Sequence, residues 1–427
     1  MIATTLILLL VLLGLSIPVG AVLGVLGLIL DQLYSMLPLS RALGEIVWTS
    51  NNEFLLVAIP LFILLGEILL RAGFAEKMYG AMSLWLSWLP GGLMHANIGA
   101  STLFAATSGS SVATAATIGT VAIPQIKHYG YNESLFLGSL AAGGTLGILI
   151  PPSINMVIYG VITNTSVPKL YLAGFIPGFL LAGLFMTTIL VACLMRPAWG
   201  GRKITATWGE RLASLVHLLP PLGIFLMVVG SIYAGLATPT EAAALGVLAA
   251  LILAAASGRL TLAMLREASE GTMRATAMIM LIIIAASFLN FILSATGITD
   301  ALIKTITGLG LPPGLMLVVV VIFYLVLGCF METLSMMITT IPIVTPIMVN
   351  LGYDPVWFGI VVIILVEAAL ITPPVGLNLY VVQSVRKGGS MNAVITGAQP
   401  FVLAMMFIIA LLAVFPDIAM WLPRLFG

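Results

Sequence analysis

Charged side chains are scarce in this sequence, and their scarcity argues against a soluble protein. Asp, Glu, Lys and Arg make up 7% of the 427 residues, against 61% hydrophobic residues, whereas a soluble domain carries about 25% charged residues. Residues 78–126, 134–168 and 305–331 contain none of these four residue types. Because a membrane span needs about 20 apolar residues, each run can hold more than one membrane element. The composition predicts an integral membrane protein.

Cysteine and clustered basic residues are also nearly absent. Cys193 and Cys329 lie in apolar segments, so we expect small buried side chains, with no disulfide framework and no metal-ligand spacing. The net charge is +1 and no basic cluster suited to nucleic acid is present. His95, His128 and His217 form no metal or protease motif, and we expect them at the membrane interface or in packing. The N-terminus lacks the basic region of a cleaved signal peptide, so we expect a retained first span.

The apolar segments predict an all-α integral membrane protein with about 10–12 transmembrane helices and two re-entrant helical hairpins. In the first half, we expect spans at about residues 2–30, 54–70, 77–94, 133–165 and 169–195, with an uncharged block at 98–126 that is interrupted by "TSGSS". The mixed segment 31–54 is too polar to cross and is expected along the membrane surface. The loop around residues 196–214 is the most basic in the chain and is therefore placed in the cytoplasm.

The second half of the sequence repeats the first. Features of the first half recur 222 residues later, including Pro124 at Pro346 (346 − 124) and the pair Pro151–Pro152 at Pro373–Pro374 (373 − 151). We therefore divide the chain into a first repeat, 1–215, and a second repeat, 216–427. Each contains spans, a surface arm (about 258–275 in the second), a hairpin (about 95–128 and 315–350) and a proline-broken helix (133–165 and 356–386). About five crossings per half would make the repeats inverted.

The second repeat begins with a segment that does not fit a single span. Residues 216–256 are too long for one crossing, and "ATPTEAAALG" within them indicates a break. Matching broken helices in duplicated halves are typical of secondary transporters. The repeat therefore favours a transporter.

Four polar breaks interrupt the apolar runs: "TSGSSVATAATIG", "GILIPPSIN", "GCFMETLSMMITTIP" and "ALITPPVGLN". Two of these breaks contain a pair of prolines, which we expect to stop one half-helix and start another. The pairs are Pro151 with Pro152 and Pro373 with Pro374. A break frees backbone groups that lipid cannot satisfy, so it is tolerated only where it is buried in protein or lines a cavity. There, carbonyls can face a cation and a half-helix N-terminus can face an anion. We expect the two breaks of each half to meet near the membrane midplane.

No arginine or lysine is near these breaks in the sequence, which favours cation-coupled uptake of an anion. Oxygen-rich breaks predict one sodium site in each half, with candidate residues Ser108, Gly109, Ser110, Ser111, Thr145, Gly147, Pro151, Asn155, Gly328, Glu332, Thr333, Thr372, Gly376 and Asn378. Candidate substrate-binding residues are Ser110, Ser153, Asn155, Thr333 and Asn378. The alternative is that these small residues only let helices pack closely.

Acids within apolar segments are functional candidates. They are Glu67, Glu241, Glu332 and Glu367. Glu332 falls in the third break and is a candidate for the site. We expect Glu67 and Glu367 to pair with polar neighbours inside the helix bundle.

The chain resembles the large membrane subunit of a tripartite ATP-independent periplasmic (TRAP) transporter, the DctM type. The matching stretches extend over nearly the whole chain and include "IPLFILLGEILLRAG", "LPGGLMHANIGASTLFAATSGSSVATAATIG", "GYNESLFLGSLAAGGTLGILIPPSINMVIYG", "GLATPTEAAALGVLAALI" and "ALITPPVGLNLYVV". The resemblance implies sodium-driven import of an organic acid, such as a C4-dicarboxylate, sialic acid or keto acid, across the bacterial inner membrane. Na⁺ is the coupling ion, and no other cofactor is expected.

The resemblance also implies partners and a mechanism. A soluble periplasmic protein would deliver the substrate, and a small four-helix membrane subunit would enlarge the scaffold. Because the sequence ends at Gly427 without a fused small-subunit segment, we expect that subunit to be a separate chain. The two hairpins and the broken helices would form a transport domain that slides against the scaffold, as in an elevator.

Two other functions are compatible with parts of this pattern. A stand-alone sodium/carboxylate symporter would share the chemistry of the breaks but would not need a binding protein. An intramembrane hydrolase would need a nucleophile and base, or paired aspartates, within spans. The four aspartates, Asp31, Asp300, Asp354 and Asp417, lie near predicted span ends, which argues against an enzyme.

Overall fold

The computed structural model describes residues 2–15, 17–35, 37–202, 204–308, 310–328, 331–373 and 376–426. Its first part comprises α1 (Ile2–Gly14), α2 (Val19–Tyr34), α3 (Leu43–Asn51), α4 (Ala58–Arg71), α5 (Phe74–Leu86), α6 (Leu93–Ser108), α7 (Ser111–Tyr129), α8 (Glu133–Leu149), α9 (Ile154–Thr163) and α10 (Val167–Met195). The rest comprises α11 (Trp208–Ser214), α12 (Leu219–Tyr233), α13 (Pro239–Ala256), α14 (Leu262–Ala295), α15 (Ile298–Gly308), α16 (Pro313–Leu327), α17 (Thr333–Asn350), α18 (Pro355–Leu370), α19 (Leu377–Arg386), α20 (Met391–Val414) and α21 (Asp417–Phe426).

The described residues form an all-α membrane protein. Six stretches are helical, long and apolar enough to cross a membrane: 54–71, 167–195, 239–256, 262–295, 333–350 and 391–414. Two further pairs of helices are each bent at a short break: α8 with α9 by 44°, and residues 208–217 with α12 by 46°. If each bent pair is one span, the number of candidate spans rises to eight. The helices α2, α16 and α18 are apolar but shorter. The expected count of 10–12 spans requires some of these shorter helices to cross, and it stays a prediction.

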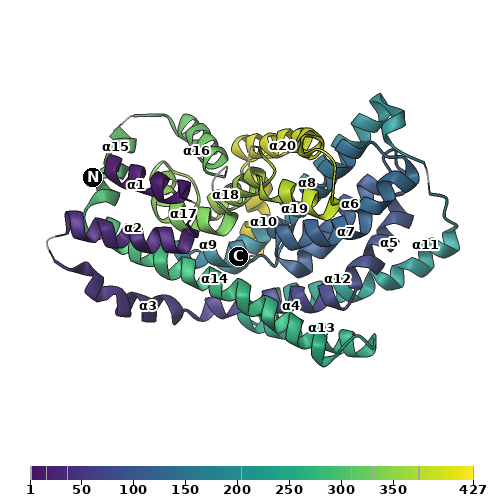
Figure 1. Ribbon diagram of the computed structural model, residues 1–427, viewed down its shortest axis with the longest axis horizontal. Helices are drawn as coiled ribbons and strands as arrows, with labels where there is room; N and C mark the ends of the chain where they lie inside the picture. The colour runs from purple at the N-terminus through teal and green to yellow at the C-terminus, as the bar shows by residue number, and fades with distance from the viewer. Residues whose placement is uncertain are drawn as a thin grey trace.

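The proline-broken helices lie at the centre of the molecule. Every residue of α8 from Leu135 to Leu149 is buried, and so is every residue of α18 from Val356 to Leu370. Helices that are apolar all round belong in a protein interior. They pack against each other, and α6, α7, α10, α19 and α20 surround α8. In Figure 1, α14 runs below this core, beside α2, α3 and α4, with which it packs.

Helix starts in the two halves keep the spacing seen in the sequence. The first residues of α7 and α17 are 222 apart (333 − 111), and so are those of α8 and α18 (355 − 133). The predicted break between residues 216 and 256 is present, because α12 ends at Tyr233 and α13 begins at Pro239. The opposite orientation of the repeats stays a prediction.

Two expected elements differ in the structure. The single span at residues 2–30 is two packed helices, α1 and α2, because Pro18 precedes the second and cannot continue a helix from the first. The second arm, expected at 258–275, is not separate. It is continuous with the following span in the 34-residue α14, because one glycine and no proline interrupt that stretch.

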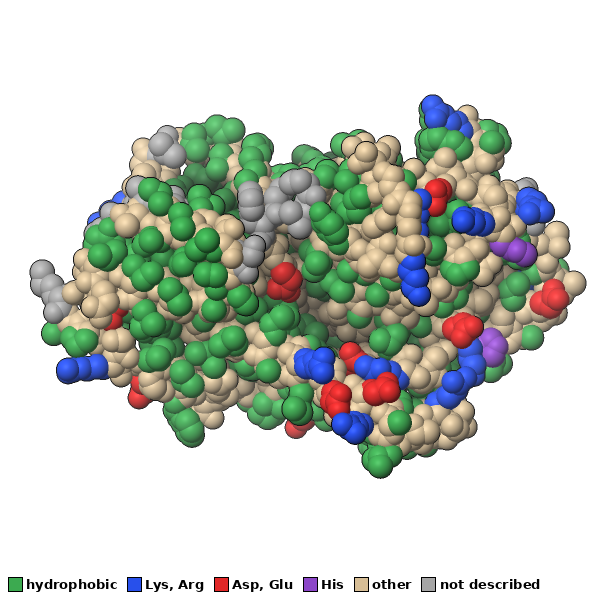
Figure 2. All heavy atoms as spheres, viewed as in Figure 1, with side chains coloured by type: hydrophobic (Ala, Val, Ile, Leu, Met, Phe, Trp, Pro, Cys, Tyr) green, Lys and Arg blue, Asp and Glu red, His purple; other side chains and the backbone are tan. Residues whose placement is uncertain are grey.

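The surface reflects membrane residence. Apolar side chains cover much of the face in Figure 2, whereas most of its charged side chains gather over the right and lower parts. Large apolar residues are widely exposed, such as Leu10, Leu194 and Leu226. Such exposure suits contact with lipid.

Candidate functional site

The first break is a tight turn between two packed helices. α6 ends at Ser108, Gly109 has φ 59°, and Ser110 precedes α7 in an extended conformation. Glycine suits the left-handed end of a helix, and serine suits the start of the next one. The Ser110 Oγ accepts a hydrogen bond from the Ala113 amide at 3.3 Å. The short sequence "SGSS" therefore stops one helix and starts another, as expected of a hairpin tip.

The double proline forms the second break, between α8 and α9. Ser153 precedes α9, and its Oγ accepts a hydrogen bond from the Met156 amide at 3.4 Å. A Cβ added to Gly109 would lie 3.5 Å from the carbonyl oxygen of Pro152. The hairpin tip and the proline break of the first half are therefore in contact, as predicted.

The third break has a carboxylate at the start of a helix. Glu332 immediately precedes α17. Its Oε1 accepts a hydrogen bond from the Leu334 amide at 3.3 Å, and its Oε2 accepts one from the Ser335 Oγ at 3.1 Å. A Cβ on Gly328 would lie 2.0 Å from the Cβ of Ala369 in α18. The end of α16 therefore packs tightly against the helix that leads to the fourth break.

The fourth break lies between α18 and α19. Thr372 donates a hydrogen bond from its Oγ1 to the Ala368 carbonyl at 2.7 Å, and Gly376 precedes α19 with φ 53°. Pro374, predicted to help break this helix, lies outside the described residues. Pro373 is described, and the helix has already ended at Leu370.

A cavity of about 420 Å³ lies between the breaks and the neighbouring helices. Both halves contribute predicted site residues to its lining, namely Ser108, Gly109, Ser110, Ser111, Asn155, Glu332 and Thr333. The opposite wall comes from α4 and α14, with Ile63, Gly66, Glu67, Leu70, Ala275, Met278 and Ile279. Its volume is in the range of small-molecule sites, about 300–1,000 Å³. Polar atoms from both halves therefore face one space.

The remaining predicted residues are not among those that line the cavity. They are Thr145, Gly147, Pro151, Ser153, Gly328, Thr372, Gly376 and Asn378. Gly147 lets the first hairpin approach, since an added Cβ would lie 2.8 Å from the Ser110 carbonyl oxygen. The Thr145 Oγ1 donates to the Ala142 carbonyl at 2.6 Å. Among these residues, Gly147 supports the site by packing.

Asn378, although it belongs to the second half, contacts a helix of the first. Its Nδ2 donates to the Ala141 carbonyl in α8 at 3.4 Å, while its buried Oδ1 has no hydrogen-bond partner among the described residues. The Nδ2 of Asn155 is also buried without a partner there. Asn155, which lines the cavity, and Asn378, which does not, each keep one buried polar atom without a partner among the described residues.

The four acids singled out in the sequence have different environments. Glu367, on α18, accepts a hydrogen bond from the Ser111 Oγ at 2.6 Å, so it does pair with a polar neighbour. Glu241 accepts from the backbone of Thr238 and caps α13 at an exposed position. That capping role explains its presence in an apolar segment.

A basic residue that was not predicted from the sequence pairs with an acid of the cavity wall. Arg71 lies 2.9 Å from Glu67, which lines the cavity, and 2.9 Å from Glu267 of α14. Arg71 is not among the residues that line the cavity, so the expectation that no arginine or lysine is near the breaks stays a prediction. The four-residue spacing of Glu67 and Arg71 on one helix was the signal that could have revealed the pair.

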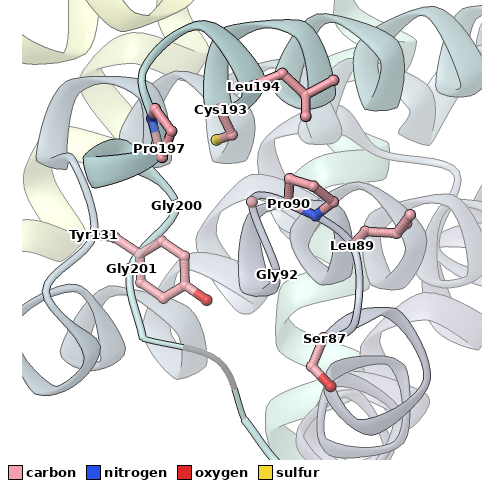
Figure 3. Close-up of a pocket in the computed structure, with 11 residues that line it drawn as sticks. Ser87, Leu89, Pro90, Gly92, Tyr131, Cys193, Leu194, Pro197, Gly200 and Gly201 are labelled. Atoms are coloured by element: carbon pink, nitrogen blue, oxygen red, sulfur yellow. The ribbon is translucent and has the colours of Figure 1, made fainter.

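A second hollow, of about 250 Å³, has a different character. It lies beside the loop that joins α5 to α6 and the chain that follows α10, and Tyr131 and Cys193 contribute to its wall (Figure 3). The Tyr131 hydroxyl accepts from the Leu93 amide at 2.9 Å. Its lining residues include no charged side chain, so the oxygen-rich cavity at the breaks is the better candidate site.

The residues around the first break offer hydroxyl oxygens to the cavity, those of Ser108, Ser110 and Ser111. In the part of the chain that the structure describes, no three His, Cys, Asp or Glu residues form a possible metal-binding group. Hydroxyls and carbonyls freed by broken helices are the ligands that secondary transporters offer to Na⁺.

Comparison with known proteins identifies relatives over nearly the whole chain. It is 35% identical over 388 residues to the C4-dicarboxylate TRAP transporter large permease protein DctM of Pseudomonas aeruginosa, covering 91% of this chain and 90% of that protein. It is 32% identical over 378 residues to the sialic acid TRAP transporter large permease protein SiaM of Vibrio cholerae, covering 88% and 87%. These relatives are transporter subunits and not enzymes.

The fold is similar to that of a solved transporter. The crystal structure of the Alcanivorax borkumensis YdaH transporter, described as having an unusual topology, matches with a TM-score of 0.58 and 17% sequence identity over 98% of both chains. That likeness supports the all-helical membrane fold. The relatives and the apolar helices together indicate a multi-pass protein of the inner membrane.

The family itself is shown by the sequence. The family described as "Tripartite ATP-independent periplasmic transporter, DctM component" matches residues 6–418. The chain therefore belongs to the DctM component family of tripartite ATP-independent periplasmic transporters.

Proposed function

We propose that this chain is the permease subunit of a sodium-driven importer of an organic acid. The observation that carries the proposal is the cavity of about 420 Å³ at which broken helices and hairpin tips from both halves meet. Its wall combines hydroxyls with a buried amide nitrogen on Asn155 that has no hydrogen-bond partner in the described part of the chain. Such a donor can bind a carboxylate oxygen, and the neighbouring oxygens can bind Na⁺.

We propose two sodium sites, one in each half. The first uses Ser108, Ser110, Ser111 and the α8–α9 break. The second uses the segment from Gly328 to Thr333 and the α18–α19 break. In the first site, hydroxyls and helix-end carbonyls would supply uncharged oxygens. In the second site, Glu332 would add a carboxylate to such oxygens.

The substrate is proposed from the cavity and from the relatives. The two relatives above carry names that specify C4-dicarboxylate and sialic acid, and both compounds contain a carboxylate. Their identities to this chain are nearly equal, so the class is proposed as a carboxylate and no single compound is chosen. Arg71 carries a positive charge close to Glu67 of the cavity wall. Its salt bridges to Glu67 and Glu267 offset that charge.

The proposed mechanism requires partners and movement. A periplasmic binding protein delivers the substrate, and a separate small membrane subunit completes the scaffold, in keeping with the word "tripartite" in the family description. The hairpins (α6 with α7, α16 with α17) and the broken helices would form the moving transport domain. The remaining helices would form the scaffold.

Uptake by proteoliposomes tests this proposal. The chain is reconstituted with a small subunit, and radiolabelled carboxylates are supplied with a candidate periplasmic binding protein. We expect uptake when a sodium gradient is imposed and none with an equal potassium gradient. Sodium-driven uptake that is equally fast without the binding protein would favour the stand-alone symporter. Uptake that ignores sodium would reject the proposed coupling.

A further inference from the structure

The segment between α10 and α12, residues 196–218, joins two membrane segments. α10, which directly precedes it, is long and apolar enough to cross a membrane, and α12 directly follows it. Residues 208–217 are bent by 46° from α12, and they include Glu210 and Arg211, which are costly inside lipid. We call residues 196–218 the connector. Its place between two membrane segments, together with these charges, puts it at the membrane surface.

Tryptophans gather on and beside the connector. Four of the seven tryptophans in the chain are there, namely Trp85, Trp88, Trp199 and Trp208. The Trp85 and Trp208 rings meet edge to face at 6.4 Å, and the Trp85 Nε1 donates to the Arg211 carbonyl at 3.0 Å. These contacts join α11 to α5 at the right-hand end of the molecule in Figure 1. Trp208 is 69% exposed, and exposed tryptophan is typical of the depth of lipid headgroups.

Large apolar side chains are exposed where the connector meets its two flanking helices. Leu194 at the end of α10 is exposed, and so are Leu212 within the connector and Leu219 at the start of α12. The hollow of about 250 Å³ lies beside the start of the connector, because Leu194 and Pro197 line it (Figure 3). Acyl chains that run along α10 and α12 would cover these apolar groups.

The positive charge of the connector is not balanced by its own acid. Its basic residues are Arg196, Arg202, Lys203 and Arg211, and its one acid is Glu210. The Glu210 Oε2 accepts a hydrogen bond from the Thr207 amide at 2.7 Å, so this carboxylate caps α11. Among the described residues, no ion pair includes an arginine of the connector.

Neighbouring segments bring further positive charge and no free acid. The Arg202 guanidinium donates to the His128 carbonyl at 2.8 Å, which places the connector beside the end of α7 and its Lys127. Residues 77–132 contain no Asp or Glu. The next acid, Glu133, pairs with Arg386. In Figure 2, lysine and arginine side chains lie on the right-hand part of the face, toward this end of the molecule.

We propose that the connector binds the headgroup of an anionic phospholipid through Arg196, Arg202 and Arg211. Arginine forms short, charge-assisted hydrogen bonds with phosphate oxygens. The Arg196 guanidinium lies over the Trp199 ring at 4.6 Å, and that of Arg211 lies over the Trp208 ring at 5.3 Å. These ring contacts position both cations without an anionic partner. Basic clusters at the membrane surface attract anionic lipids, and the exposed apolar residues favour a lipid over a soluble anion.

Lipid binding by the purified chain tests the proposal. The full chain in a neutral detergent receives phosphatidylglycerol or, as a control, phosphatidylcholine, and native mass spectrometry counts the bound lipid over a range of concentrations. We expect saturable binding of phosphatidylglycerol, at least about tenfold tighter than that of phosphatidylcholine. The affinity should fall as salt is added, because exposed charges are screened. Inorganic phosphate, which lacks acyl chains, should not displace the lipid at equal concentration.

A double variant locates the binding surface. Because Arg202 also contacts α7, the variant is Arg196→Gln/Arg211→Gln. We expect the affinity for phosphatidylglycerol to fall about 25-fold, about fivefold for each arginine lost. Lysine at the same two positions keeps the charge and should retain most of the affinity. Arg266→Gln is the matched control, since Arg266 is an exposed arginine of α14 that already pairs with Glu270, and it should leave the affinity unchanged.

Three results would overturn the proposal. The first is equal affinity of the unmodified chain for the two lipids, a comparison that does not depend on the folding of any variant. The second is undiminished binding of phosphatidylglycerol by the double variant. The third is loss of a co-purified small subunit from the double variant with lipid binding unchanged, which would assign this surface to a protein contact. Neither sodium nor substrate enters these measurements, so their outcome is independent of the proposed transport.

Discussion

Asn155 and Asn378 follow the two double prolines at nearly matching positions, and each leaves one buried polar atom without a hydrogen bond among the described residues. A buried polar atom that lacks a partner costs about 1–3 kcal/mol. The free atom on Asn155 is a donor, which suits a carboxylate. The free atom on Asn378 is an acceptor, which suits a cation. We therefore propose complementary roles for the two asparagines, Asn155 toward the substrate and Asn378 toward sodium.

Removal of single oxygen ligands should weaken sodium activation. In Ser110→Ala and in Asn378→Ala, we expect the sodium concentration for half-maximal uptake to rise about tenfold, corresponding to ~1.4 kcal/mol per site. Uptake by proteoliposomes, measured over a range of sodium concentrations, checks this. Thr187→Ala is the matched control, because the Thr187 hydroxyl donates to the Gly183 carbonyl of its own helix at an exposed position. Unchanged sodium activation in both site variants would argue against the assignment.

Gly147 tests the packing that brings the first hairpin to α8. In Gly147→Ala, the added Cβ would lie 2.8 Å from the Ser110 carbonyl oxygen, which is backbone and cannot move aside alone. We expect uptake to fall at least about tenfold while the chain still inserts, since overpacking costs about 1–3 kcal/mol. Gly183→Ala in α10 has nothing within 4 Å of the new Cβ and should leave uptake unchanged. Equal uptake by the two variants would contradict the packing argument.

At the level of helices, the breaks follow from local residue chemistry. Glycine at Gly109 ends one helix in the left-handed region, and serine at Ser110 and Ser153 caps the next. Proline at Pro151 and Pro152 removes backbone donors, so α8 cannot continue into α9. These effects act over a few residues, which is why all four breaks could be predicted from the sequence.

The double proline should be needed for transport and not for assembly. Each interior proline disfavours a helix by about 3 kcal/mol, so replacing Pro151 and Pro152 by alanine should restore a continuous helix and turn its free backbone groups inward. We expect a chain that inserts and assembles but transports almost nothing. Pro177→Ala is the control, since Pro177 lies inside the continuous helix α10. The measurement is sodium-driven uptake at matched membrane content.

Near-normal transport by the double alanine variant would have a clear meaning. The prolines would then only bend a helix, and the α8–α9 break would not supply ligands. Loss of transport in the Pro177→Ala control would instead point to a general sensitivity of the bundle to proline removal.

At the level of the whole molecule, contacts between distant segments could not be predicted from the sequence. Ser111 and Glu367, which are hydrogen-bonded, are 256 positions apart in the sequence. Arg71 and Glu267, which form a salt bridge, are 196 positions apart. Nothing near either residue in the sequence indicates its partner, because these contacts depend on how α4, α7, α14 and α18 pack. The duplicated halves and the breaks were predictable, whereas the wall formed by α4 and α14 was not.

Direct sodium binding tests the central claim that the four breaks build two sodium sites, one in each half. The measurement is the thermal unfolding temperature of the purified chain in NaCl and in KCl at equal ionic strength, which requires neither the substrate nor the partners. Because a ligand that binds only the folded state stabilises it by ~2.7 kcal/mol at a hundred times its dissociation constant, we predict a saturable rise with sodium. The double variant Ser110→Ala/Asn378→Ala should lose most of that rise. The same unfolding temperature in both salts, or an undiminished rise in the double variant, would contradict the account.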